Sequence, residues 1–325
     1  MLKRFLAVFT AVFVTVSSFA ACSTGSGKAY GNGHFNIVTT IFPEYDWVMN
    51  VLGDNPAGAD VTLLLDGSAD LHSYQPSAAD IMKISTCDML VYVGGQSGLW
   101  IDDALKQKTN PDMIVINLMD TLGDSLKEEE IVEGMQGEEE EEADGGIEYD
   151  EHTWLSLRNA AKLVNAISEG LQKADPANAS GYASNASSYI NKLNDLDAEY
   201  QAVVNSAARK TVLFGDRFPF RYLTDDYGLE YYAAFVGCSA ESEASFATIT
   251  FLSQKIDELA LPVVLTIEGD NHRIAETIIE NTKTKDQKIL IMDSMQSVSK
   301  KDIENGTTYL SVMENNLEVL REALG

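Results

Sequence analysis

The feature that most constrains the fold is a regular alternation of short apolar runs with helical patterns. Runs of four to six residues, rich in Val, Ile and Leu, are typical of parallel strands that are buried on both faces. The sequence therefore predicts an α/β protein of two lobes, each with a four-stranded, mainly parallel sheet flanked by helices. The eight strands are expected at Ile37–Ile41, Val61–Leu65, Met89–Val93, Met113–Leu118, Thr211–Phe214, Glu230–Phe235, Val263–Ile267 and Lys288–Met292.

A long helical segment separates the two sets of strands. After Asp175 and Pro176, apolar residues recur at steps of three, four or seven, which places one apolar stripe along a helix of about seven turns. We expect an N-terminal lobe at 35–174 with an acidic loop at about 124–148, a rigid linking helix at 175–208, and a C-terminal lobe at 209–325. The stripe consists of Tyr182, Tyr189, Leu193, Leu196, Tyr200 and Val203.

The first residues have the order of a secretory signal. Lys3 and Arg4 precede an apolar run at 5–16, which is too short for a bilayer span. Small residues then lead to Cys22 and a stretch rich in Ser and Gly, which resembles a bacterial lipobox with its tether, although Phe19 stands where Leu is more usual. We expect a signal peptide at 1–21 and a lipidated Cys22 with a flexible tether at 22–34. The alternative is an ordinary signal peptide whose cleavage leaves a free cysteine.

The net charge excludes one class of function. The chain has 23 Lys and Arg against 50 Asp and Glu, a formal charge of −27, which would repel a nucleic acid backbone. Nine of the glutamates lie in Glu128–Glu142, where no Lys or Arg occurs. Like charges at this density predict a mobile loop. Two interpretations stay open: a loop that collects cations, or a solvated spacer with no specific role.

Two of the four histidines follow predicted strands. His72 comes after the second strand and His152 after the fourth, each just before a helix. Carboxyl ends of parallel strands form the sheet edge where open α/β sheets bind ligands. A single loop histidine is usually a polar surface residue, but two at equivalent edges indicate a metal site.

The C-terminal lobe offers carboxylates at similar positions. Asp216 is expected directly after the strand at Thr211–Phe214, and Asp293 follows the last strand. Glu268 ends its strand, and Glu243 lies on a loop that enters a helix. Such acids more commonly cap helices or pair with an arginine. The remaining cysteines, Cys87 and Cys238, are expected to be small buried side chains without a disulfide.

Several segments together resemble a known family. From about Asn36 to the C-terminus, the chain resembles the zinc and manganese solute-binding lipoproteins of ABC importers, the cluster A-I receptors. The resemblance implies two lobes, a rigid linking helix and one metal held between the lobes. The segments that carry it are Thr39–Trp47, Gly67–Ser77, Val91–Gly95, Glu151–Asn159 and Tyr309–Leu317.

The resemblance also assigns ligands. His72 and His152 occupy the family's two ligand positions in the N-terminal lobe, and Asp293 occupies the carboxylate position in the C-terminal lobe. The family's third ligand is a histidine in many zinc members and a glutamate in manganese members. Residues 215–222 contain no histidine, so Asp216 is the best substitute, with Glu243 or a water as alternatives.

These observations predict a monomeric, extracytoplasmic lipoprotein that is anchored to the membrane, captures a divalent metal and delivers it to the permease of an ABC importer. Zinc is favoured because mixed imidazole and carboxylate sites bind zinc more tightly than manganese, although Mn²⁺ also suits such a site. Catalysis is not expected. Two other functions stay open: a metal-dependent hydrolase with Glu151 as general base, and a surface adhesin with a structural metal.

Overall fold

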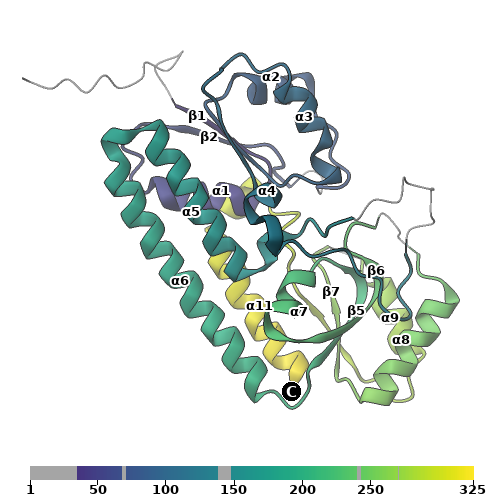
Figure 1. Cartoon of the computed structure of the whole chain (residues 1–325). Coiled ribbons are helices and arrows are strands. Elements are labelled where there is room, and N and C mark those ends of the chain that lie inside the picture. Colours follow the sequence, from purple (N-terminus) through teal and green to yellow (C-terminus); the bar gives the residue numbers. More distant parts are fainter. Residues whose placement is uncertain (1–34, 68–70, 138–147, 240–242, 270) are drawn as a thin grey trace, which may run out of the picture.

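A computed structural model describes residues 35–67, 71–137, 148–239, 243–269 and 271–325. It has two lobes, one above the other in Figure 1, with long helices along one side of both. Cys22 and the predicted signal peptide and tether lie outside the described residues. Within the described ranges, no helix combines the length and apolar character that crossing a bilayer requires.

The N-terminal lobe contains a four-stranded parallel sheet, as predicted. Its strands are β1 (Asn36–Thr39), β2 (Asp60–Leu63), β3 (Met89–Tyr92) and β4 (Ile114–Asn117), in the spatial order β2-β1-β3-β4. The helices α2 and α3 lie on one side of this sheet in Figure 1, and α1 and α5 on the other. The helices of this lobe are α1 (Phe42–Leu52), α2 (Ala78–Thr86), α3 (Leu99–Leu105), α4 (Leu118–Leu122) and α5 (Leu157–Ala174).

The C-terminal lobe repeats this topology. Its strands are β5 (Thr211–Phe218), β6 (Glu230–Val236), β7 (Val263–Thr266) and β8 (Lys288–Ile291), parallel and in the order β6-β5-β7-β8. In each lobe the second strand along the chain therefore lies at one edge of the sheet. The helices are α7 (Arg221–Tyr227), α8 (Phe246–Leu259), α9 (Arg273–Glu280), α10 (Lys300–Glu304) and α11 (Tyr309–Leu324).

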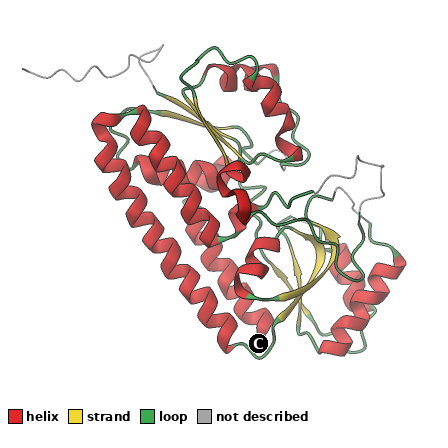
Figure 2. Cartoon of the chain, in the orientation of Figure 1, coloured by secondary structure: helices red, strands yellow, loops and turns green. Residues whose placement is uncertain are grey.

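One long helix, α6 (Ala179–Ser206), connects the lobes after a 3-10 turn at Pro176–Asn178. All six residues of the predicted apolar stripe are buried, because this face of α6 packs on α5, α1 and α11. Figure 2 shows α6 as a continuous helix along both lobes.

The last helix ties the two lobes together. Tyr309, at the start of α11, is fully buried, and its hydroxyl donates to the backbone oxygen of Trp154 at 2.7 Å. Its ring also packs edge-on against Trp47 of α1, with 5.2 Å between the ring centroids. Since one continuous apolar cluster includes residues of both lobes, the lobes share part of their core.

The strand that precedes the third predicted ligand is longer than expected. β5 continues to Phe218, and its pairing with β6 shifts register between Phe214 and Arg217. Asp216 therefore lies inside β5 at this irregularity, and the prediction that it follows the strand is wrong. An apolar run marks the regular part of a strand, whereas a bulge adds residues of any type to it.

The acidic segment is partly ordered against the C-terminal lobe. The backbone N–H of Gln136 donates to Ala234 of β6 at 2.9 Å, and its side chain accepts a bond from the N–H of Ser245. Gly134 packs so closely on the ring of Phe251 in α8 that a side chain there would overlap it. The prediction of a mobile loop is therefore wrong for 128–137, because β6 is an edge strand with free backbone groups. Residues 138–147 lie outside the described residues.

Candidate metal site

The two predicted histidines meet where the lobes face each other. His72 lies in the loop between β2 and α2, and His152 immediately precedes a 3-10 turn at Thr153–Leu155. Their Nε2 atoms are 3.1 Å apart, although 80 residues separate them in sequence. The His152 side chain is fully buried and that of His72 is 12% exposed.

The other nitrogen of each ring is held by a polar neighbour. Nδ1 of His152 lies 3.0 Å from Oδ1 of Asp150, which also accepts the backbone N–H of His152. Because an ionised carboxylate only accepts, His152 donates from Nδ1 to Asp150, and its Nε2 is left as an acceptor toward Nε2 of His72. Nδ1 of His72 lies 2.9 Å from the Ser97 hydroxyl and 3.8 Å from Glu151 Oε2. Both rings are thus oriented with Nε2 toward a common point.

The separation of the two Nε2 atoms suits a metal ion. With Zn–N bonds of about 2.05 Å and tetrahedral angles, two ligating nitrogens lie about 3.3 Å apart. The observed 3.1 Å is close to that distance. The arrangement can therefore hold zinc with little movement of either ring.

Cys238 is the third member of this group. One ring nitrogen of each histidine and Sγ of Cys238 all lie within 4.8 Å of one another. We call His72, His152 and Cys238 the histidine–cysteine cluster. Burial raises the pKa of the Cys238 thiol, and nearby carboxylates, including that of Asp150, raise it further. A metal that binds this sulfur must therefore displace the thiol proton.

Asp216 is placed differently. Its carboxylate accepts the backbone N–H of Arg217 at 2.8 Å and that of Ile267 at 3.4 Å. Burial raises its pKa, and the nearby His272 partly offsets this rise. The structure thus directs the Asp216 carboxylate to the end of β7, and it is not a member of the histidine–cysteine cluster.

The other predicted acids lie around the end of β8. Asp293 follows β8, and its Oδ1 accepts the backbone N–H of Met295 at 2.7 Å. Glu268 accepts bonds from the N–H and hydroxyl of Ser294 and from the N–H of Gln296. These contacts hold the loop after β8, so Glu268 has a structural role. Glu243 is exposed to solvent before α8.

The loop that carries Asp293 contacts the loop that carries His152. The indole Nε1 of Trp154 donates to the backbone oxygen of Ser294 at 2.9 Å, and its ring lies 5.2 Å from the ring of His152. Asp293 is therefore one residue from a direct contact with the His152 loop, although its carboxylate is not a member of the cluster.

Asp293→Asn is expected to stabilise the metal-free protein and to weaken zinc binding. Burial and the neighbouring Glu268 raise the pKa of Asp293 to about 7, so the folded state keeps a proton that the unfolded chain loses near pH 4. Stability should therefore fall as pH rises from about 4 to about 7. The uncharged amide of the asparagine would remove this loss of stability. We therefore expect Asp293→Asn to raise the free energy of unfolding by about 1–2 kcal/mol at pH 8, measured by thermal unfolding without metal. If stability falls with rising pH in Asp293→Asn as much as in the starting protein, this prediction is contradicted.

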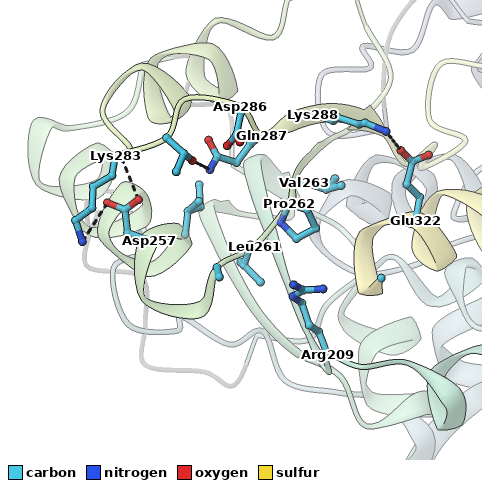
Figure 3. A pocket seen from close by; sticks show the side chains of 14 residues that line it. Arg209, Asp257, Leu261, Pro262, Val263, Lys283, Asp286, Gln287, Lys288 and Glu322 are labelled. Carbon is cyan, nitrogen blue, oxygen red and sulfur yellow. Dashed lines mark hydrogen bonds and ion pairs between the residues drawn. The ribbon is translucent and has the colours of Figure 1, made fainter.

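A cavity in the C-terminal lobe lies elsewhere. It has a volume of about 650 Å³ and lies at the amino ends of β7 and β8, the opposite edge of the C-terminal sheet from Cys238. Two of its lysines pair with carboxylates of the same cavity: Lys288 lies 2.6 Å from Glu322 and Lys283 lies 3.9 Å from Asp257 (Figure 3). The cavity is therefore separate from the histidine–cysteine cluster.

Comparison of the sequence with known families identifies the family to which this fold belongs. Residues 37–323 match the family described as "Zinc-uptake complex component A periplasmic". The chain belongs to this family. The resemblance noted from the motifs is thereby confirmed.

Individual relatives agree. The chain is 29% identical over 324 residues to the high-affinity zinc uptake system protein ZnuA of Bacillus subtilis, and the match covers 98% of this chain and 97% of that protein. It is 30% identical over 304 residues to the zinc-binding lipoprotein AdcA of Streptococcus pneumoniae, covering 91% of this chain. The chain spans only 57–58% of the length of the AdcA relatives.

Solved structures confirm the predicted fold class. The Zn(II)-bound ZnuA-like domain of Streptococcus pneumoniae AdcA matches with a TM-score of 0.70 and 29% identity, over 90% of this chain and 99% of that one. The lipoprotein YcdH of Bacillus subtilis, described as metal-dependent, matches with a TM-score of 0.72 and 27% identity, over 89% and 99% of the two chains.

Sequence reasoning missed Cys238. The apolar run at Glu230–Phe235 predicts a strand that ends three residues before Cys238, and the observed β6 ends at Val236, two residues before it. The rule that located the two histidines, a ligand at the carboxyl end of a parallel strand, applies equally to this cysteine. The signal was present, but an isolated cysteine is more often a small buried side chain.

Proposed function

We propose that this protein is an extracytoplasmic receptor that captures a divalent transition metal, with zinc favoured, between its two lobes. His72 and His152 bind the metal through Nε2, and Asp293 supplies a carboxylate from the C-terminal lobe. The observation that carries this proposal is the 3.1 Å separation of two Nε2 atoms whose partner nitrogens are already held by other groups.

The same proposal includes delivery to a membrane partner. Zinc-uptake relatives support transfer of the metal to the permease of an ABC importer. An AdcA relative is named a lipoprotein, which supports anchoring through Cys22. The chain acts as a monomer, since one chain contributes donors from both lobes. The sequence-based prediction of Asp216 as a ligand is the alternative that Asp216→Ala tests, since a large loss of zinc affinity in that variant would support it.

A receptor is favoured over a hydrolase by the surroundings of Glu151. A general base must reach a metal-bound water, but Oε1 of Glu151 accepts the backbone N–H of Ser97 at 3.0 Å. Its Oε2 lies on the Nδ1 side of His72, 3.8 Å from that atom, which is the side away from the metal-binding nitrogen. Glu151 is therefore placed to orient His72.

Metal analysis tests the proposed function. Protein purified without added metal should contain about one zinc per chain, and competition titration should give a higher affinity for Zn²⁺ than for Mn²⁺. Affinity should fall between neutral pH and about pH 5, because imidazole and thiol groups bind metal only when deprotonated. Absence of bound transition metal, or an affinity independent of pH, would contradict the proposal.

A further inference from the structure

We propose that the thiolate of Cys238 is a second ligand from the C-terminal lobe beside Asp293 and replaces the expected histidine, so that this chain holds its metal through two imidazoles, a carboxylate and a sulfur. This inference rests on the proposed function and extends it. It names a ligand that the sequence pattern assigned to Asp216, and it makes the metal site softer than one built from nitrogen and oxygen alone.

The position of Cys238 in the fold supports this role. It lies two residues after the end of β6, at the carboxyl edge of the C-terminal sheet. β6 holds the same place in its sheet as β2 does in the N-terminal sheet, and β2 leads to His72. The two lobes thus present a donor from equivalent edge strands toward the space between them.

The residue before Cys238 is shaped for close approach to a ligand. A Cβ atom added to Gly237 would lie 2.9 Å from Cε1 of His152 and 2.9 Å from the backbone oxygen of Phe218. The absence of a side chain therefore lets the backbone of the C-terminal lobe pack directly against the imidazole. A turn closed by the bond from the N–H of Ser239 to the oxygen of Val236 at 3.3 Å holds this backbone.

Distances in the histidine–cysteine cluster are compatible with shared coordination. In a tetrahedral zinc site with Zn–S of about 2.3 Å, sulfur and nitrogen ligands lie about 3.6 Å apart. One ring nitrogen of each histidine and the sulfur of Cys238 are already within 4.8 Å of one another. A movement of about 1 Å, within the range of a side-chain or small lobe adjustment, is sufficient to close the site.

The rival donor is committed elsewhere. Both oxygens of Asp216 accept backbone N–H groups of the C-terminal lobe, whereas Cys238 is a free thiol. A thiolate also has a chemical consequence, because soft sulfur ligands favour Zn²⁺ over Mn²⁺, which prefers oxygen. Cys238 is thus both a ligand and a determinant of metal specificity.

Cobalt spectroscopy tests for the metal–sulfur bond. The full chain should carry Cys22→Ser, so that Cys87 and Cys238 are the remaining thiols. Loading with Co²⁺ should produce an intense thiolate-to-metal charge-transfer band in the near ultraviolet. Cys238→Ser should abolish the band, whereas Cys87→Ser should retain it, because Cys87 is buried between α2 and the amino end of β3 and is not a member of the histidine–cysteine cluster. A band that persists in Cys238→Ser would overturn the inference.

Zinc affinity separates this inference from the proposed function. Cys238→Ser should lower it by at least the 10–100-fold that loss of an outer-shell partner costs, and Asp216→Ala should leave it nearly unchanged. Tight binding in the starting protein that depends on His72 and His152, without a charge-transfer band, would overturn the sulfur ligand alone. If the starting protein binds neither Co²⁺ nor Zn²⁺, the proposed function fails.

Metal preference gives a second readout that does not depend on cobalt. Cys238→Asp keeps an anionic donor but replaces sulfur by oxygen, so the ratio of Zn²⁺ to Mn²⁺ affinity should fall by at least about tenfold. Circular dichroism of the variant would show that the fold is retained. An unchanged ratio in a folded variant would contradict the role of Cys238 in specificity.

Discussion

His152→Ala is expected to lower zinc affinity by more than about 100-fold. The substitution removes a nitrogen that binds the metal directly, and this should cost more affinity than the roughly 10–100-fold lost when an outer-shell partner is removed. His152 is fully buried, and Asp150 fixes its ring from the Nδ1 side. His72→Ala should have a similar effect, which competition titration with a chelator would measure.

A matched control comes from another histidine of the C-terminal lobe. His272 immediately precedes α9, lies near Asp216 and is outside the histidine–cysteine cluster. His272→Ala should therefore leave zinc affinity within about twofold of the starting protein. If His272→Ala weakens binding as much as His152→Ala does, the ligand assignment is wrong and the region of Asp216 is part of the site.

Trp154→Ala is expected to destabilise the protein by about 3–5 kcal/mol, the usual cost of removing a fully buried tryptophan. Its side chain is completely buried and donates to Ser294 in the C-terminal lobe. The substitution leaves a cavity at the lobe interface and an unpaired oxygen at Ser294. Since Trp154 also packs on His152, zinc affinity should fall as well. Denaturant unfolding without metal and a zinc titration would measure the two effects.

Two variants separate packing from the hydrogen bond. Trp154→Phe keeps much of the ring volume but loses the donor to Ser294, and should cost about 1–3 kcal/mol. Trp100→Ala, in α3, removes a tryptophan that is only partly buried and should cost less than Trp154→Ala. Equal losses in Trp100→Ala and Trp154→Ala would show that the interface position of Trp154 is not special.

The predicted secondary structure was correct because its signals are local. Each apolar run records the burial of one strand on both faces, and the steps of three and four along α6 record one buried helical face. All eight strands form at the expected places within a few residues. Both predicted N-lobe histidines also lie after the strands to which the sequence assigned them.

Local patterns did not describe the irregular parts of the chain. Nothing in the apolar run at 211–214 indicates that β5 continues through a bulge to Phe218. The prediction that Asp216 follows the strand was wrong for this reason. The acidic segment was expected to be mobile from its charge alone. Its attachment to β6 at Gln136 depends on an open sheet edge in the other lobe, which no window of sequence around it records.

The sequence by itself therefore determined the two sheets, the linking helix and the strand ends at which ligands could lie. Only the tertiary structure decided which of these donors meet. His72 and His152 are joined with Cys238 because the two lobes pack through Trp154 and Tyr309, whereas Asp216 is turned toward β7. Convergence of side chains depends on the packing of distant segments, and that packing is a property of the whole core.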